Sequence, residues 1–169
     1  MTDNQKELYV VFGASGNIGG GVVEALIVKK KKALLISRNS ASLEKFKEKE
    51  HLYLLEADIS KEVKKVKEKI RKLIVELKVK IIHVIVSIGG LVEGNGDDVE
   101  ADTVTKKVSD ILRANASAYD SVQEHLTEEC SVTFVTGEAA TKVIILNLYL
   151  TEIRLSQKSM PLQQLEILL

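Results

Sequence analysis

A run of apolar residues followed by three regularly spaced glycines is the feature that most constrains the fold of this chain. Residues 8–12 predict a buried strand, and Gly13, Gly16 and Gly19 follow it directly. A helical pattern of apolar residues begins at once, over residues 22–27. Strand, glycine turn and helix in this order form a cradle for phosphate, because free N–H groups and the positive end of the helix dipole lie at the helix N-terminus. The sequence therefore predicts a dinucleotide-binding turn near its start.

Each glycine of this turn has its own expected role. Gly13 permits a tight turn out of the strand, Gly16 lets the backbone approach a pyrophosphate, and Gly19 lets the helix pack close to the strand. A glycine-rich turn that binds no ligand is the alternative interpretation. The residues of the turn that we expect to contact the nucleotide are Gly13, Ser15, Gly16, Asn17, Ile18 and Gly19.

Strand and helix patterns alternate along most of the remaining chain. The strand at residues 81–86 is apolar at nearly every position, which is typical of a parallel sheet covered on both faces. Ser60 is a candidate cap for the helix that follows the third strand. This alternation predicts an α/β fold: a Rossmann-type, doubly wound parallel sheet with strand order 3-2-1-4-5 and one further element at its edge. Further strands are predicted at residues 33–37, 52–55 and 131–136, and helices at 43–49, 63–77 and 104–126.

The end of the chain has a different character. Residues 143–155 are apolar almost all round, which implies burial against the edge of the sheet or against another subunit. Leu, Glu and Arg allow a helix here, while Ile, Val and Tyr favour a strand, and we predict a helix. The expected organisation is a Rossmann domain over residues 1–142 and an apolar C-terminal segment over residues 143–169. This segment and the helix at 104–126 are the candidate surfaces for a homo-oligomer.

Composition excludes several classes of partner. The 24 basic residues balance the 24 acidic ones, so nothing favours nucleic acid or an anionic membrane surface. The lysine-rich stretches at 29–32 and 61–80 are interpreted as solvated surfaces. The longest apolar stretch, residues 143–150, is too short to span a bilayer. The N-terminus lacks the apolar core of a signal peptide, and we expect a cytoplasmic protein.

Cysteine and histidine give no sign of a metal site. Cys130 is the single cysteine, so no internal disulfide is possible, and a small buried residue is the expected role. His51, His83 and His125 are far apart in the sequence and fall on different predicted elements. A core or surface role is expected for each, and no metal is predicted.

The end of the second strand bears on the choice of nucleotide. In dinucleotide-binding folds an acidic residue at this point holds the ribose hydroxyls of NAD. This chain has Ser37, Arg38 and Asn39 instead. An arginine pairs with a 2′-phosphate, so NADP is favoured over NAD, the alternative being a surface arginine with no ligand. Asp58, after the third strand, is a candidate contact to the adenine edge; its alternative role is to cap the next helix.

With these motifs in place, residues 8–142 resemble a short-chain dehydrogenase/reductase of a divergent, atypical branch. The resemblance is carried by the glycine turn, by the motifs after the second and third strands, and by residues 133–137, which match the strand that ends in the family's catalytic serine. It implies that Thr136 takes the place of that serine and that Asn115 positions a water in a proton relay. The other residues to which it gives a role in cofactor binding are Ile59, Ser87, Ile88 and Gly89.

The chain also departs from the family pattern. The family's chemistry needs a tyrosine with a lysine four residues later, and none of the four tyrosines here has one. The nearest imitation has Glu138 in place of the tyrosine, followed by Lys142, for which an ion pair on a helix is the alternative. The family continues through further strands and a substrate-binding lid, so the chain is expected to be C-terminally shortened.

Two functions follow from this balance of matches and departures. The first is an NADP(H)-binding oxidoreductase that acts on a small carbonyl or alcohol, with Thr136, Asn115 and Lys142 lining the catalytic site. The second is a catalytically inactive relative that binds NADP(H) and serves a regulatory or interaction role. The first is favoured, because the cofactor-binding half of the family pattern is present.

Overall fold

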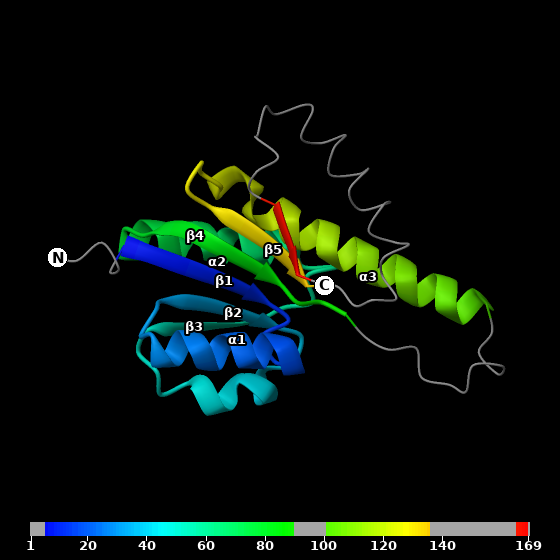
Figure 1. Cartoon of the computed structure of the whole chain (residues 1–169), viewed down its shortest axis with the longest axis horizontal. Helices are drawn as coiled ribbons and strands as arrows, with labels where there is room; N and C mark the ends of the chain where they lie inside the picture. Colours follow the sequence, from blue (N-terminus) through cyan, green and yellow to red (C-terminus); the bar gives the residue numbers. More distant parts are fainter. Residues whose placement is uncertain (1–5, 90–100, 136–164, 169) are drawn as a thin grey trace.

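Parallel strands form one continuous sheet in the order β3-β2-β1-β4-β5-β6 (Figure 1). The computed structural model describes residues 6–89, 101–135 and 165–168. The predicted order 3-2-1-4-5 is confirmed, and β6 adds the edge element beside β5. The strands are β1 Glu7–Phe12, β2 Ala33–Ser37, β3 Leu52–Glu56, β4 Lys80–Val86, β5 Ser131–Val135 and β6 Leu165–Leu168. The helices are α1 Asn17–Val28, α2 Val63–Leu77 and α3 Ala101–Val122, with 3₁₀ helices η2 Ser40–Phe46 and η3 Gln123–His125.

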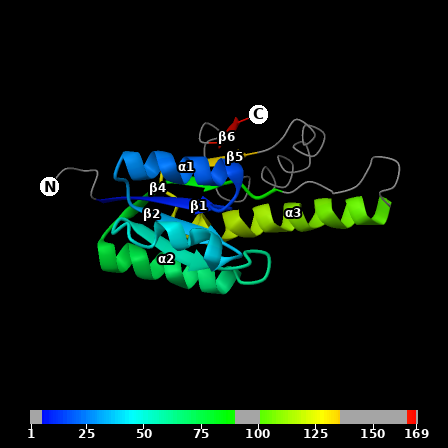
Figure 2. The ribbon, with the colours of Figure 1, turned by 90° about the horizontal axis from the view of Figure 1, so that it is seen from below.

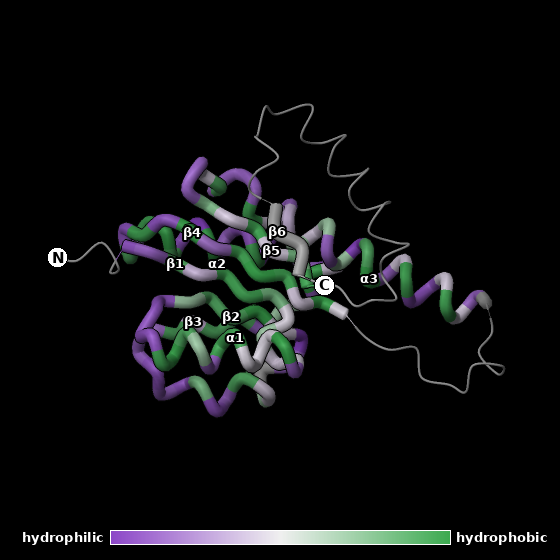
Figure 3. The backbone as a smooth tube through the Cα atoms, in the orientation of Figure 1, coloured by the Kyte–Doolittle hydropathy of each residue, from purple (hydrophilic) through white to green (hydrophobic). Residues whose placement is uncertain are grey.

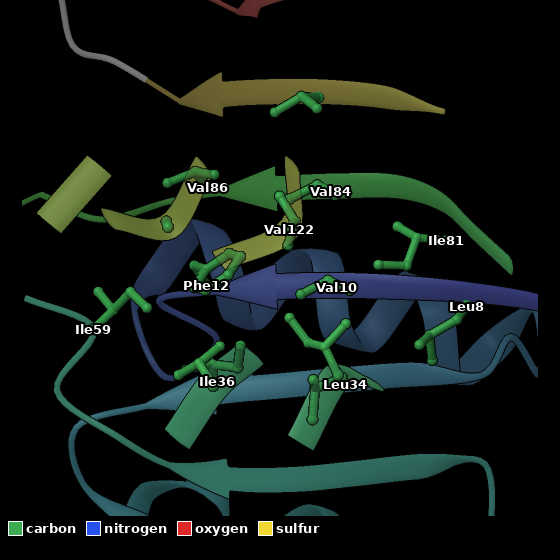
Figure 4. Packing of buried hydrophobic residues seen from close by; sticks show 14 of the residues in the cluster. Leu8, Val10, Phe12, Leu34, Ile36, Ile59, Ile81, Val84, Val86 and Val122 are labelled. Carbon is green, nitrogen blue, oxygen red and sulfur yellow. The ribbon is translucent and has the colours of Figure 1, made fainter. Parts of the chain in front are cut away.

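Helices cover both faces of this sheet. Figure 2 shows α1 on one side and α2 with α3 on the other. Alternate residues of β1 point to opposite faces, so Val10 packs toward α2 and α3 while Val11 packs toward α1. The larger cluster, shown in part in Figure 4, includes Phe12, Ile36, Val86 and Val122. Strands that are buried on both faces explain why their sequences are apolar throughout rather than alternating.

The amphipathic pattern of α2 decides how this helix packs. Val66, Ile70 and Leu73 fall at steps of four and three and are buried against the sheet. The other positions of α2 are mainly charged. Figure 3 shows the same kind of alternation between hydrophilic and hydrophobic residues along α3. Lys67 reaches from α2 to Asp120 of α3, at 3.3 Å, and this ion pair joins the two helices on the same face.

The cap of one helix and the type of another differ from the sequence prediction. Ser60 does not cap α2, because its N–H and hydroxyl both donate to Asp58 Oδ1, at 3.1 and 2.6 Å, and α2 begins at the predicted Val63 with Glu62 as its N-cap residue. The helix predicted at residues 43–49 is a 3₁₀ helix that begins at Ser40, since Asn39 Oδ1 accepts a hydrogen bond from Ala41 N at 2.9 Å. In both places a local side-chain hydrogen bond, which apolar periodicity does not predict, decides the role of a polar residue near the start of the helix.

The first half of α3 extends beyond the sheet (Figures 1 and 2). Residues 102–107 are exposed, whereas Ala114, Ala118 and Val122 are buried against the larger cluster. Among the helices in the described ranges, none is long and apolar enough to cross a membrane. The segment predicted as a helix, residues 143–155, lies outside the described residues.

Replacing Lys78 with glycine is expected to stabilise the protein. Lys78 ends α2 with φ 52° and ψ 46°, a left-handed conformation that costs less for glycine than for a residue with a Cβ. We expect Lys78→Gly to raise the free energy of unfolding by about 0.5 to 1 kcal/mol, measured by urea denaturation. Arg71→Gly, an exposed site inside the same helix, should lower it by about 1 kcal/mol. If both variants had a lower free energy of unfolding than the wild-type protein, the assignment of strain to Lys78 would be wrong.

Cys130 is buried, as predicted, and burial raises the pKa of its thiol to about 11. Because only the thiolate reacts with disulfide reagents, the folded protein should react about a hundredfold more slowly at pH 8 than an exposed thiol of ordinary pKa. A thiol-exchange reagent that releases a chromophore would measure this rate. Unfolding in guanidinium should restore rapid reaction with one thiol per chain, whereas equal rates before and after unfolding would contradict the burial.

Candidate nucleotide-binding site

The glycine turn between β1 and α1 lies where the order of the strands reverses. β1 pairs with β2 on one side and with β4 on the other. Gly13 N and Ala14 N both donate to Ile36 O, at 3.0 and 3.2 Å, and Ser87 N donates to Phe12 O at 3.0 Å. The turn is therefore tied to the carboxyl ends of both neighbouring strands. In open α/β sheets this is the position at which ligands bind.

The backbone requires glycine at two positions of the turn. Gly13 has φ +75°, and a Cβ there would lie 2.2 Å from Ser87 O. A Cβ on Gly19 would lie 2.2 Å from Gly13 O, so the helix could not pack this closely against the turn. A Cβ on Gly16 would approach only Gly13 O, at 3.3 Å. The tight turn and the close helix packing expected from the sequence are both present.

The N-terminus of α1 suits an anionic group. The helix begins at Asn17, with Gly16 as its N-cap residue, and no side chain caps it. The N–H groups of a first helical turn have no acceptor within the helix. There is also no acidic residue in this turn of α1. The uncapped N–H groups and the helix dipole together fit the diphosphate of a dinucleotide.

Residues at the end of β2 are held against the glycine turn. Ser15 Oγ and Ser37 Oγ are hydrogen-bonded at 2.7 Å, and Asn39 N donates to Ser37 Oγ at 3.3 Å. Ser37 is buried, while Ser15 and Arg38 are exposed. Within the described residues Arg38 forms no hydrogen bond or ion pair through its side chain. The backbone on either side of Arg38 is thus ordered, and its guanidinium is available to a ligand.

The loop after β3 brings a carboxylate and an apolar side chain. Asp58 accepts hydrogen bonds from Ser60 and pairs with Lys61 Nζ at 3.3 Å. The hydrogen bond from Ser60 and the nearby Lys61 lower the pKa of the Asp58 carboxyl. Ile59 is buried in the larger cluster (Figure 4), so any contact from this residue to a nucleotide would come from its backbone.

Asn115 joins α3 to the segment that follows β4. Its side chain is buried, and Nδ2 donates to Ile88 O at 3.3 Å and to Ile111 O at 2.9 Å. The structure therefore brings Asn115 next to Ser87 and Ile88, beside the glycine turn. Gly89 follows them and is exposed. The other predicted catalytic residues, Thr136 and Lys142, lie outside the described residues.

Sequence patterns did not indicate the contacts between β4 and β5. His83 lies between two hydroxyls: Nδ1 contacts Ser131 Oγ, and Nε2 is 3.2 Å from Thr133 Oγ1. His83 pairs with Ser131 in the sheet register, so this cluster lies at the start of β5, away from the carboxyl ends of the strands. No group of three or more possible metal ligands occurs in the part of the chain that the structure describes. The contact between Ser15 and Ser37 was also not foreseen, although both residues were predicted to bind the nucleotide.

Comparison with solved structures identifies proteins with the same arrangement. No protein-family model matches the sequence, and no curated protein matches it. A short-chain dehydrogenase/reductase from Saccharomyces cerevisiae matches with a TM-score of 0.65 and 23% identity, over 80% of this chain and 55% of that one. A short-chain dehydrogenase from Bacillus anthracis matches with a TM-score of 0.68 and 13% identity, over 83% and 59%.

A third solved structure with this fold is that of a protein named for its cofactor. It is an NADPH-dependent reductase involved in bacilysin biosynthesis, with a TM-score of 0.62 and 19% identity, over 78% of this chain and 59% of that one. The chain thus spans little more than half the length of the proteins that it matches. At these identities the likeness concerns the fold. The structure agrees with the resemblance indicated by the motifs: this chain has the Rossmann-type fold of the short-chain dehydrogenase/reductases.

Proposed function

We propose that this protein binds NADP(H) and belongs to the oxidoreductases of the short-chain dehydrogenase/reductase kind. The observation that carries the proposal is the uncapped N-terminus of α1, which lies beside the exposed Arg38 at the end of β2. The first fits a diphosphate and the second a 2′-phosphate. The NADPH dependence of one structural neighbour supports the same choice. As the sequence suggested, the protein would act in the cytoplasm.

In this proposal the chain's own residues bind and orient the dinucleotide. The N–H groups at Asn17 and Ile18 would donate to the diphosphate, and Arg38 would pair with the 2′-phosphate. The bound cofactor would supply hydride transfer to or from a small carbonyl or alcohol. Thr136 would offer a hydroxyl to the substrate oxygen, and Lys142 would be the candidate for holding a proton near it. Asn115 would support this site through its hydrogen bond to Ile88 O.

A second candidate is a catalytically inactive protein that binds NADP(H) in a regulatory role. The observation that favours it is the absence of a lysine four residues after any tyrosine of the sequence. That lysine would lower the pKa of the tyrosine and hold the ribose, so proton transfer to a carbonyl oxygen would be slow without the pair. The cofactor would still bind through the glycine turn and Arg38, although the contact of that lysine with the ribose would be missing.

Titration with NADPH and NADH, followed by nicotinamide fluorescence, tests cofactor binding directly. We expect a dissociation constant in the micromolar range for NADPH and weaker binding of NADH. A panel of small carbonyl compounds then separates the two candidates: turnover supports the oxidoreductase, and tight binding without turnover supports the inactive relative. If neither nucleotide binds, both candidates fail, and the glycine turn serves the fold alone.

A further inference from the structure

β3 is the outermost strand on one side of the sheet (Figure 1). It pairs in parallel with β2, and within the described ranges no strand pairs with its other side. The neighbouring η2 lies over a face of the sheet, since Leu43 and Phe46 belong to the smaller hydrophobic cluster. The outer edge of β3 is therefore the part of the sheet at which a further strand could be added.

The hydrogen bonds between β2 and β3 show which backbone groups of β3 point inward. Ala33 N donates to His51 O at 3.0 Å, and Ala57 N donates to Ser37 O at 2.9 Å. Alternate residues of a strand in a parallel ladder turn their N–H and C=O toward the same neighbour. The odd-numbered residues from 51 to 57 consequently face β2.

The even-numbered residues of β3 turn their backbone groups away from β2. Leu52 N donates to Lys49 O at 2.9 Å. The N–H and C=O of Leu54 and Glu56 form no hydrogen bond with any residue that the structure describes. Such a row of donors and acceptors is what an extended peptide pairs with when it adds a strand to a sheet.

The sequence of β3 lacks the features that commonly prevent pairing at an edge, which are proline, lysine and a bulge. Its residues are LYLLE, and its register with β2 is continuous from Leu52 to Glu56. Tyr53 and Leu55 are half-buried against the larger cluster, and Leu54 is half-buried against the smaller one. A further strand would therefore cover apolar surface on both faces of the sheet.

The charge on this edge distinguishes between two kinds of partner. Glu56 is exposed, and none of the ion pairs among the described residues includes it. In an antiparallel pair of two copies of β3, outward-facing residues lie opposite outward-facing residues, so Glu56 would meet an even-numbered residue. The even-numbered residues from 48 to 58 are Glu48, Glu50, Leu52, Leu54, Glu56 and Asp58. A second copy thus supplies no cation, whereas a different chain with a basic residue at this position does.

We propose that the outer edge of β3 binds an extended segment of a partner protein that carries a basic residue opposite Glu56. The backbone of Leu54 and Glu56 supplies the hydrogen bonds, and the half-buried side chains of Tyr53 and Leu55 supply apolar contact. The inference goes beyond the proposed function, because β2 separates this edge from the glycine turn and no nucleotide is needed.

A short, fluorescein-labelled peptide of alternating valine and lysine is the probe, and fluorescence anisotropy measures its binding. Valine favours the extended chain, and lysine supplies the cation. A peptide of alternating valine and glutamate is the matched control. It should bind about tenfold more weakly, because like charges would lie opposite each other at Glu56. If the wild-type protein binds neither peptide, or binds both equally, the inference is wrong.

Two N-methylated forms of the lysine peptide separate backbone pairing from charge. One carries its methyl groups on the lysine amides and the other on the valine amides, so their charges are the same. In an extended peptide these two sets of amides point to opposite sides, and only one set faces β3. We expect one form to lose binding and the other to retain it. Equal affinities of the two forms would overturn the inference, because the contact would not involve the backbone of an added strand.

Substitutions in the protein locate the binding to this edge. Glu56→Gln should weaken binding of the lysine peptide about threefold, as expected for an exposed ion pair. Glu24→Gln, which removes an exposed carboxylate from α1, should leave the affinity unchanged. Leu54→Pro removes an outward N–H without removing a hydrogen bond to β2 and should weaken binding about tenfold. If Leu54→Pro does not fold, as judged by thermal unfolding, the methylated peptides still decide the question.

Amide hydrogen exchange shows which partner occupies the edge. In the free protein the N–H groups of Leu54 and Glu56 should exchange faster than those of Tyr53 and Leu55, and the lysine peptide should slow the first two. If the peptide leaves their exchange unchanged, it binds elsewhere and the inference fails. If Leu54 and Glu56 are protected without peptide, and more so at higher protein concentration, a second copy pairs with β3 and the proposed partner is wrong.

Discussion

Gly13→Ala is expected to lower the free energy of unfolding by about 3 to 4 kcal/mol, which makes it one of the most damaging single substitutions in the chain. Two effects add at this position. The residue has φ +75°, a conformation that an L-residue with a Cβ adopts only at a cost. The new Cβ would also lie 2.2 Å from Ser87 O, which is backbone and cannot move without disturbing the end of β4. A domain of this size is stabilised by only about 5 to 15 kcal/mol, so a large part of the margin is lost.

Gly21→Ala is the matched control for this substitution. Gly21 is in α1, and a Cβ there would meet nothing within 4 Å. Alanine should therefore stabilise the helix by about 0.5 to 1 kcal/mol. Urea or guanidinium denaturation, followed by circular dichroism, measures both variants. Similar stabilities for Gly13→Ala and Gly21→Ala would mean that the turn does not adopt the conformation described here.

Arg38→Asp is expected to weaken binding of NADPH about a hundredfold, equivalent to about 2.7 kcal/mol. The substitution removes a guanidinium that can pair with the 2′-phosphate and places a carboxylate against the same doubly charged group. NADH has a hydroxyl in place of that phosphate, and a carboxylate at the end of the second strand can accept a hydrogen bond from it. Binding of NADH should therefore stay the same or improve, so the nucleotide preference inverts.

Arg71→Asp makes the same change of net charge at an exposed position on α2 and is the control for long-range electrostatics. It should change the dissociation constant for NADPH less than threefold, because charges farther apart than about 8 to 10 Å are screened at physiological salt. Nicotinamide fluorescence measures all four combinations of variant and nucleotide. If Arg38→Asp weakened the binding of NADPH and of NADH equally, Arg38 would lie outside the 2′-phosphate site.

Most of the fold could be predicted from the sequence because its strands are buried on both faces. Residues 33–37, for example, form β2 with the predicted bounds. A short, continuous apolar run between polar residues is typical of a strand that is buried on both faces. The spacing of Val66, Ile70 and Leu73 likewise fixed the buried face of α2. The right-handed crossover between parallel strands then left the order 3-2-1-4-5 as the expected topology.

Local side-chain hydrogen bonds were harder to predict. Ser60 is a residue type that often caps helices, yet its hydroxyl donates to Asp58 in the preceding turn, and Ser60 does not cap α2. The side chain of Ile59, a residue predicted to contact the nucleotide, is buried in the hydrophobic cluster, which leaves its backbone for that contact. Such choices depend on which acceptor or cavity lies within a few ångströms, and residue type alone does not contain that information.

The backbone path of the glycine turn could be predicted from the sequence alone. Three glycines between an apolar strand and a helix specify a backbone path, and the structure requires glycine at two of them on steric grounds. Tertiary structure alone decided how that turn meets the end of β2. Ser15 and Ser37 are separated by 22 residues, and their hydroxyls come within 2.7 Å only because β1 and β2 pair in parallel. The pairing of strands determines which residues far apart in the sequence come into contact, and the pattern of residues within one strand does not predict these contacts.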